Sequence, residues 1–311
     1  MDHILGQTAA LNIIRQALGS ERVHHAWIFH GPAGVGKFTT ALAFAGQLLG
    51  EDFQGDIGNH PDLHVITKEL ALHSDDRETR NRKLMNIPVE VLRARLLRPA
   101  YLKSQMGGAK AFIIDEAELL DLTGQNTLLK TLEEPPAGTY LILVTSQEDQ
   151  LLPTIRSRCQ RVAFTALDDG HVAKWLDSNA DLDAKRKADV VAFARGSIGR
   201  AHLAVTYEQD EWLRMVRPML DKIATGKVEA NFGETLLGLC DGFAERWVAE
   251  HKNASKDAAN KSAIRAMLGL LGEECRRRIS ELAERAEPDD PDAAEAMLNP
   301  WLRGVDLLSE A

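Results

Sequence analysis

A glycine-rich loop between an apolar run and a helical run is the feature that most constrains the fold of this 311-residue chain. Residues 31–40 read G-P-A-G-V-G-K-F-T-T, in which Gly31, Gly36 and Lys37 fit the spacing G-x-x-x-x-G-K-[S/T] except at its last position. Glycines let backbone N–H groups converge on phosphate oxygens, and the lysine adds a positive charge. The loop therefore predicts a strand–loop–helix unit within an α/β domain built on a parallel sheet.

The last position of the motif is where the chain departs from it. A Ser or Thr hydroxyl there ordinarily binds the Mg²⁺ of a bound nucleotide, but this chain has Phe38. A phenyl ring has no lone pair for a metal. Thr39 could still reach a phosphate, but it lies about 100° further round the predicted helix and is a poor replacement for the metal ligand. We expect Gly34, the other loop residues and Lys37 to cradle the phosphates of ATP or ADP, with Mg²⁺-dependent hydrolysis weak or absent. A glycine-rich turn without a ligand is the alternative.

Strand-like apolar runs alternate with helical spacing in the first half of the chain, as in α/β nucleotide-binding domains. The predicted strands are residues 25–30, 110–115 and 140–145, and the predicted helices are residues 8–19, 39–49, 88–99 and 122–133. Short helices are expected from about Thr165, then longer amphipathic helices at 208–224, 231–251 and 261–286 and a last short helix after the E-P-D-D-P-D sequence at 287–292. The charge-dense residues 68–85 predict an exposed loop. The predicted domains are an α/β domain at 1–165, a small helical domain at 166–205 and an all-helical domain at 206–311.

Polar side chains follow two of the predicted strands. Asp115 and Glu116 end the second strand; in a nucleoside triphosphatase the first would hold Mg²⁺ through water and the second would orient the attacking water. An exposed acidic turn is the alternative. Thr145 ends the third strand, where its hydroxyl could contact a γ-phosphate, or where a β-branched residue simply closes the strand.

Two arginines stand where they could contact a phosphate. Residues 154–159 read T-I-R-S-R-C, in which Arg158 is either a solvated surface charge or a finger that reaches a phosphate on a neighbouring subunit. Residues 196–201 read G-S-I-G-R-A, which puts Arg200 early in a helix. There it is either a contact to a nucleotide bound by the same chain or an exposed residue after an N-cap by Ser197.

The composition narrows the class of protein. A net charge of −9 argues against an autonomous DNA binder, because phosphate neutralisation supplies most non-specific affinity, so we expect partner proteins. We find no apolar run long enough for a membrane span and no signal-peptide start. The three cysteines are scattered, so we expect no metal and a cytoplasmic protein. One basic cluster could face DNA, although a solvated helix face is the commoner explanation; it comprises Arg93, Arg95, Arg98 and Lys103.

Together, these motifs resemble a known family. Residues 123–136 read T-G-Q-N-T-L-L-K-T-L-E-E-P-P, and with the downstream S-R-C they are similar to the AAA+ clamp-loader subunits of DNA replication. The I-L-G-Q, H-H-A and H-P-D sequences fit the same family; they occupy residues 4–7, 24–26 and 60–62. The resemblance covers about residues 1–205, and the remainder only as a generic helical collar. The defective loop, the isolated H-P-D-L and the G-S-I-G-R sequence most resemble the delta-prime type of bacterial DNA polymerase III.

The resemblance implies an AAA+ domain, a helical lid and an oligomerising collar. It implies that Arg158 is a finger offered to an adjacent ATPase subunit, that Thr145 is the first sensor and that Arg200 is the second. The implied partners are the other clamp-loader subunits of a hetero-oligomeric ring, the sliding clamp, and primed DNA through the assembled complex. The delta-prime type is typically a stator without ATP hydrolysis of its own. The zinc-binding cysteine cluster often found in the family is missing from residues 50–59, so no zinc is expected.

Two other functions stay open. An active AAA+ ATPase, either a loader motor or a related remodeller, would explain Asp115 and Glu116, which in a stator would be vestigial. A nucleotide-binding adaptor outside replication is the third, and the L-E-E-P-P and S-R-C sequences count against it.

Overall fold

The computed structural model describes residues 1, 4–50, 60–73, 76, 86–106, 108–224, 227, 230–250 and 256–285. The contacts divide the chain into two compact units, Met1–His202 and Leu203–Ala311. Most of the predicted small helical domain at 166–205 belongs to the first unit, and the division into three domains stays a prediction. The predicted helix after 287–292 and most of the charge-dense loop at 68–85 lie outside the described residues.

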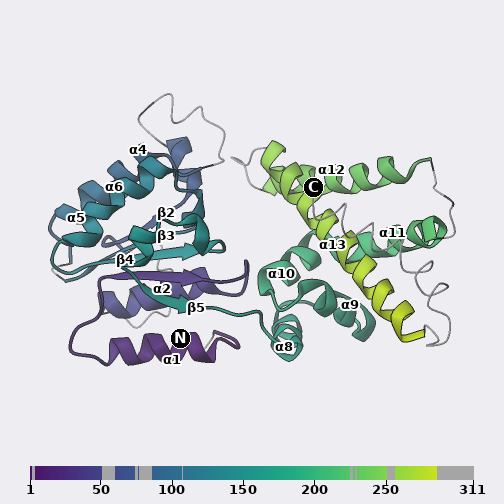
Figure 1. Ribbon diagram of the computed structural model, residues 1–311, viewed down its shortest axis with the longest axis horizontal. Coiled ribbons are helices and arrows are strands. Elements are labelled where there is room, and N and C mark those ends of the chain that lie inside the picture. Colours follow the sequence, from purple (N-terminus) through teal and green to yellow (C-terminus); the bar gives the residue numbers. More distant parts are fainter. Residues whose placement is uncertain are drawn as a thin grey trace. The chain divides into compact units, whose positions relative to one another are not determined.

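A parallel five-stranded sheet forms the centre of the first unit, which confirms the predicted α/β fold class (Figure 1). Its order is β2-β3-β4-β1-β5, and every neighbouring pair is parallel. The strands are β1 (Ala26–His30), β2 (Leu63–Ile66), β3 (Lys110–Ile114), β4 (Thr139–Thr145) and β5 (Gln160–Ala163). The sequence did not predict the two edge strands, because β2 and β5 have only four residues each and carry polar residues within their short runs.

Helices cover both faces of this sheet (Figure 1). One face carries α1 (Thr8–Leu18) and α2 (Lys37–Leu49); the other carries α4 (Val89–Leu92), the π-helical η3 (Arg93–Leu97), α5 (Arg98–Tyr101), α6 (Leu122–Glu133) and α7 (Pro153–Arg156). Successive side chains of a strand point to opposite faces, so β1 serves both layers. Trp27 and Phe29 pack on the α1 and α2 side, whereas Ala26 and Ile28 pack on the other. A sheet buried on both faces explains why its central strands read as continuous apolar runs.

Short elements at the strand ends and a helical segment complete the first unit. The 3₁₀ turns are η2 (Lys68–His73), η4 (Ala117–Leu119) and η5 (Glu148–Gln150). The helices after β5 are α8 (Asp169–Asn179), α9 (Ala184–Ala194) and α10 (Ile198–Tyr207), the last of which continues into the second unit. Asp168 and Asp183 cap the N-termini of α8 and α9 by accepting hydrogen bonds from the backbone N–H groups of His171 and Arg186.

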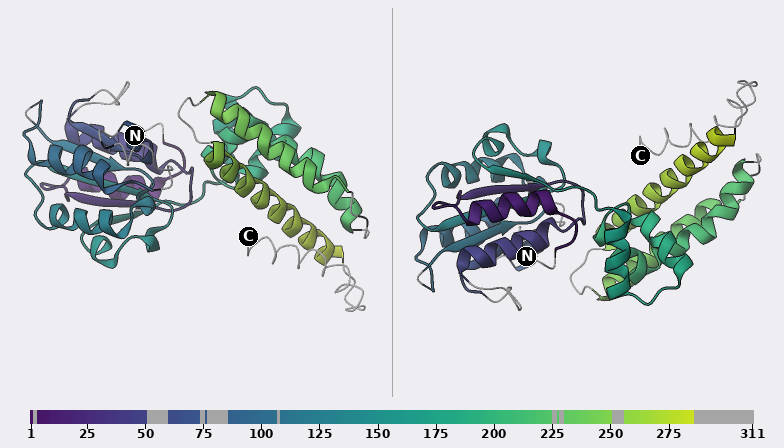
Figure 2. Two further views of the ribbon diagram at one scale, coloured as in Figure 1. Left: turned by 90° about the horizontal axis from the view of Figure 1, so that it is seen from above. Right: turned by 90° about the horizontal axis from the view of Figure 1, so that it is seen from below.

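The second unit contains helices and no strands among its described residues. It comprises the end of α10, α11 (Gln209–Ala224), α12 (Phe232–Glu250) and α13 (Lys256–Arg285), of which α12 and α13 run along each other (Figure 2). Helix α13 begins five residues before the predicted position. Aromatic rings join three of these helices: Phe243 contacts Tyr207, Trp212 and Trp247 at centroid distances of 4.9, 6.2 and 5.7 Å.

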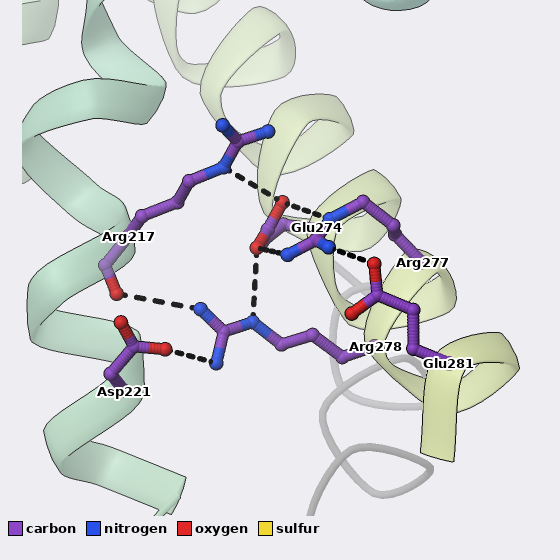
Figure 3. A network of polar contacts seen from close by, with 6 residues as sticks. All are labelled: Arg217, Asp221, Glu274, Arg277, Arg278 and Glu281. Carbon is purple, nitrogen blue, oxygen red and sulfur yellow. Dashed lines mark hydrogen bonds and ion pairs between the residues drawn. The ribbon is translucent and has the colours of Figure 1, made fainter. Parts of the chain in front are cut away.

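A buried carboxylate links α11 and α13 in this unit (Figure 3). Glu274 is 2% exposed and accepts hydrogen bonds from Arg217, Arg277 and Arg278. Burial alone would raise the pKa of Glu274, but the hydrogen bonds from Arg277 and Arg278 and the charge of Arg217 outweigh it and hold the pKa at about 2. Arg278 also pairs with Asp221 at 2.7 Å and donates to the carbonyl oxygen of Arg217 at 3.4 Å. With the contact between Arg217 and Glu274, three contacts of the network join α11 and α13.

Candidate nucleotide-binding site

The glycine-rich loop lies between β1 and α2, as the sequence predicts. Gly31, Gly34 and Gly36 have φ values of 137°, 72° and 99°, a region that residues with a Cβ rarely adopt. A Cβ at Gly31 would lie 2.1 Å from the carbonyl oxygen of Phe164, so that glycine is also required by close packing. The loop delivers the chain directly into the N-terminus of α2, where unpaired backbone N–H groups favour an anion.

Lys37 is the first residue of α2, and its ammonium turns back into the loop. Nζ donates hydrogen bonds to the carbonyl oxygens of Gly31 at 2.7 Å and Pro32 at 2.5 Å, and lies 3.3 Å from Ser146 Oγ. The residue is 5% exposed. Burial lowers the pKa of Lys37, and the charges of Glu118 and Asp115 oppose that effect. The loop therefore holds a buried positive charge beside two carboxylates.

Phe38 follows at the position where the motif has its metal ligand. Its ring is partly buried and packs against the hydrophobic core beneath α1 and α2, and it also lines the cavity described below. Thr39 is exposed on the first turn and lines the same cavity. Thr40 is buried and donates its hydroxyl to the carbonyl oxygen of Gly36. Mg²⁺ thus has no oxygen ligand at position 38, whose side chain serves the core instead.

A cavity of about 920 Å³ opens beside the loop. It brings together most of the predicted cofactor-binding residues with both carboxylates predicted from the end of β3. From the loop and the strand ends it is lined by Ala33–Thr39, Asp115, Glu116, Glu118 and Val144–Gln147. Its remaining walls are Ile4, Leu5, Trp175, Ile198, Gly199 and His202, all within the first unit. The volume and the mixture of apolar walls with polar groups are typical of small-molecule sites.

The carboxylates in this cavity differ in their partners. Burial raises the pKa of Asp115 to about 6, and a hydrogen bond from the backbone N–H of Glu116 opposes the rise. Glu116 has a left-handed φ of 50° and its carboxylate lies 2.7 Å from Lys68 Nζ. Glu118 accepts a hydrogen bond from the backbone N–H of Ser146 at 3.2 Å. Its Oε2 is buried without a hydrogen-bond partner among the described residues.

Glu118 and Ser146 are cavity residues that we did not predict from the sequence. Each follows closely after a residue that the sequence singled out, Asp115 in one case and Thr145 in the other. Thr145 lines the cavity as predicted, and its Oγ1 accepts a hydrogen bond from the backbone N–H of Gln147 at 3.0 Å. Both residues could have been found from their positions just after the carboxyl ends of two parallel strands, where polar residues of separate strands come together.

The start of α10 is hydrogen-bonded directly to the loop. Ser197 Oγ donates to the carbonyl oxygen of Ala33 at 2.9 Å, and Gly199 N–H donates to the carbonyl oxygen of Gly34 at 2.9 Å. A Cβ at Gly199 would lie 2.8 Å from Gly34 Cα. We call these two hydrogen bonds the loop–helix clasp. It fixes the glycine-rich loop against the last helix of the first unit.

Arg200 lies just beyond the clasp. Its guanidinium is 5.0 Å from the centre of the Phe193 ring, and burial lowers its pKa. The N–H of Arg200 donates to Ser197 Oγ at 3.1 Å, as in the N-cap alternative, but Arg200 is half-buried and not exposed as that alternative expected. Arg200 is absent from the described residues that line the cavity. Its role as a second sensor stays a prediction.

Arg158 lies outside this cavity, just after α7. Its Nη2 lies 2.6 Å from Glu133 Oε1, and its Nη1 donates to the carbonyl oxygen of Thr154 at 2.9 Å. The side chain is 35% exposed. Arg158 is absent from the described residues that line the cavity, and its role as a finger stays a prediction.

The basic residues predicted to face DNA lie on one helical segment or just after it. All four are exposed: Arg93 and Arg95 on η3, Arg98 on α5 and Lys103 after it. Within the described residues, no cluster of three or more His, Cys, Asp or Glu side chains could hold a metal. Of residues 50–59, the segment where the family's zinc cluster would stand, all but Gly50 lie outside the described residues. In the part of the chain that the structure describes, we find no helix suited to crossing a membrane.

Comparison with known proteins gives a consistent picture. The model of the family "DNA polymerase III, delta subunit" matches residues 6–168, just over half of the chain. A DNA polymerase III subunit delta' from Pseudomonas aeruginosa is 32% identical over 195 residues, 58% of this chain and 56% of that protein. The corresponding subunit of Yersinia pestis is 34% identical over 52% of this chain and 49% of its own length.

A subunit with another name also matches. DNA polymerase III subunit gamma of Buchnera aphidicola is 31% identical over 63% of this chain and 55% of its own length. The chain therefore spans about half the length of the curated relatives it matches.

Proposed function

The chain belongs to the DNA polymerase III delta subunit family, and from this premise we propose that it is a clamp-loader stator of the delta-prime type. A stator here is a subunit that holds its place in a hetero-oligomeric ring and offers a residue to its neighbour without hydrolysing nucleotide itself. The relatives named subunit delta' support this choice within the family.

The observation that carries this proposal is the place of Phe38. An active site of this kind needs a hydroxyl there for the metal ion that accompanies the phosphates. The phenyl ring instead packs against the core that α1 and α2 share. Hydrolysis in such sites depends on a metal that neutralises developing charge on the phosphates, so losing the ligand removes the main source of catalysis.

The rest of the loop is suited to binding the phosphates of a nucleotide without hydrolysing it. Gly31, Gly34 and Gly36 keep the backbone clear of Cβ atoms, and Lys37 supplies a buried positive charge. ATP or ADP would therefore be held by the loop, Lys37 and the N-terminus of α2. Bound nucleotide would supply a structural anion at this position.

A titration of the purified chain tests the stator proposal directly. We expect ATP or ADP to bind equally with and without Mg²⁺, and ATP hydrolysis to stay at the buffer background. Tight Mg²⁺-dependent binding with turnover comparable to a loader ATPase subunit would contradict the proposal. Phe38→Thr should introduce Mg²⁺ dependence, whereas Phe38→Leu, which keeps an apolar side chain without a metal ligand, should not.

Arg158 is the residue we propose to act on a neighbour. A guanidinium that reaches a transferring phosphate across a subunit boundary contributes roughly 10³–10⁵ in rate. Arg158→Ala in a complex reconstituted with the other clamp-loader subunits should therefore nearly abolish ATP hydrolysis at the adjoining site while the ring still assembles. Full DNA-stimulated ATPase in an assembled complex with this variant would show that the finger assignment is wrong.

The carboxylates favour a second candidate, an active AAA+ ATPase. Asp115 and Glu118 line the same cavity as Lys37, so acidic groups lie where a motor subunit would use them. Against this, Glu116, which would orient the attacking water, is paired with Lys68. Asp115→Asn separates the two functions: it should abolish turnover in a motor and leave a stator's complex as active as before.

The proposed partners follow from the family. They are the other clamp-loader subunits, the sliding clamp and primed DNA held by the assembled complex. The exposed basic residues on η3 and α5 are our candidates for DNA contact; they are Arg93, Arg95, Arg98 and Lys103. Neutralising one of them should reduce the salt dependence of DNA binding by the complex, by about one unit of slope for each phosphate that the side chain no longer neutralises.

A further inference from the structure

The guanidinium of Arg158 is held at two points by its own chain. Glu133 Oε1 lies 2.6 Å from Nη2, and the carbonyl oxygen of Thr154 accepts from Nη1 at 2.9 Å. Glu133 is the last residue of α6, whereas Thr154 belongs to α7. Two elements of the fold therefore fix the end of a long side chain that otherwise has many rotamers.

The backbone beside Arg158 is anchored as well. Ile155, three residues before it, is fully buried, and Cys159, the next residue, packs against the same hydrophobic core. Burial raises the pKa of the Cys159 thiol to about 12, which marks it as a packing group. The N–H of Arg158 donates to the carbonyl oxygen of Ile155 at 3.0 Å. The side chain is the remaining source of freedom, and Glu133 and Thr154 restrict it.

The same geometry leaves Arg158 open to a second acceptor. A guanidinium has five N–H donors, and the two contacts engage one nitrogen each, Nη2 for Glu133 and Nη1 for Thr154. The side chain is partly exposed, so an anion from another chain can reach the remaining donors. Arg158 can bind that anion without breaking its ion pair with Glu133.

We propose that Glu133 is a positioning residue for Arg158, which it holds in the orientation presented to an anionic phosphate of a neighbouring subunit. This inference rests on the finger role of Arg158 in the proposed function. Its benefit is preorganisation, because a guanidinium already oriented loses less side-chain freedom when it binds. Its cost is a nearby negative charge, which the solvent screens because half of the Glu133 side chain is exposed.

Three variants in the reconstituted clamp-loader complex test the proposal through the rate of DNA-stimulated ATP hydrolysis. Glu133→Ala should lower the rate about fivefold, because an exposed ion pair holds its geometry only weakly. Glu133→Gln keeps an oxygen that accepts from Nη2 and should retain at least about half of the rate. Glu134→Ala is the matched control: this adjacent carboxylate is exposed and forms no ion pair among the described residues, so the variant should leave the rate unchanged.

A second measurement reports on the side chain itself. Arginine side-chain NMR of the full chain should show that Arg158 Nε–H becomes more mobile in Glu133→Ala and stays ordered in Glu133→Gln and Glu134→Ala. A general structural role for Glu133 would instead lower the melting temperature and leave Glu133→Gln as impaired as Glu133→Ala.

Arg158→Ala separates this inference from the function on which it rests. If Arg158→Ala lowers ATP hydrolysis and Glu133→Ala does not, the positioning role is wrong and the finger role stands. If Glu133→Ala raises the rate, Glu133 restrains Arg158, and the positioning role is also overturned. If Arg158→Ala has no effect in an assembled complex, the finger role is the one that fails.

Discussion

The pKa of a buried carboxylate is lowered in the helical unit of the chain and raised in the α/β unit. Glu274 in the helical unit is surrounded by three guanidinium groups, which hold its pKa at about 2 despite its burial. Asp115 beside the glycine-rich loop is also largely buried, and burial raises its pKa to about 6. Lys37, whose positive charge acts on the pKa of Asp115, donates its hydrogen bonds to the backbone of the loop and to Ser146.

The difference distinguishes a carboxylate that stabilises the fold, Glu274, from a carboxylate that can still bind a ligand, Asp115. The three arginines that pair with Glu274 belong to α11 and α13, so the chain itself neutralises this carboxylate. Asp115 and Glu118 line a cavity, and neither forms an ion pair among the described residues. Perturbed pKa values in a cavity are a mark of functional sites, whereas the Glu274 network perturbs a pKa for structural reasons alone.

The largest effect we expect comes from breaking the Glu274 network. Glu274→Ala leaves Arg217, Arg277 and Arg278 facing one another, and should lower the free energy of unfolding by about 3 kcal/mol in chemical denaturation at pH 7. Glu281→Ala is the control, because that carboxylate is 47% exposed, and it should cost less than about 0.5 kcal/mol. An equal loss in the free energy of unfolding in the two variants would show that the buried ion pairs of Glu274 stabilise the fold no more than an exposed pair does.

The pH dependence of this contribution has a definite sign. The folded-state pKa of Glu274 is depressed from 4.5 to about 2, so its stabilisation is present above pH 4.5 and lost as the pH falls toward 2. Glu274→Gln should therefore flatten the acid limb of the stability curve. An unchanged acid limb would contradict the pairing of Glu274 with its three arginines.

Asp115 should give a smaller effect of opposite sign. Its raised pKa means that its contribution is favourable below about pH 3.8 and is lost as the pH rises through about 6. Asp115→Asn should therefore increase the free energy of unfolding at pH 8 by about 1 kcal/mol, less than the full shift because water reaches part of the side chain. The gain should vanish at pH 4. Destabilisation at pH 8 would mean that the carboxylate stabilises the fold.

The smallest effect should come from the partner of Glu116. Lys68 pairs with Glu116 at 2.7 Å, and the two side chains are 25% and 45% exposed. Lys68→Ala should change the free energy of unfolding by less than about 0.5 kcal/mol. A loss above about 1.5 kcal/mol would place Glu116 with Glu274, as a carboxylate that the fold depends on.

The sequence predicted the parts of the fold and site that depend on local pattern. The glycine-rich loop, α6 and the three central strands each have their signal within a dozen residues, and the structure has them within one or two residues of the predicted ends. Helix α2 begins at Lys37, two residues before the predicted start, because a helix that follows this loop starts at the lysine itself.

What the sequence did not predict depends on contacts between distant residues. Glu118 joins Ser146 across 28 positions, and Ser197 joins Ala33 across 164. No periodicity or spacing encodes such pairs, because each requires the sheet order and the path of α10 to be known first. The pairing of Glu133 with Arg158 is of the same kind, although both residues lie in motifs that the sequence singled out.

The loop–helix clasp has a consequence for how this chain can vary. A side chain at Gly34 would place its Cβ 3.0 Å from Gly199 Cα, and a side chain at Gly199 would place its Cβ 2.8 Å from Gly34 Cα. The Cα atom of each glycine thus lies where a Cβ on the other would be placed, although the two residues lie far apart in the sequence. In related chains both sites should therefore stay glycine, because a Cβ at either one meets the backbone of the other and no change of side chain at the second site makes room for it.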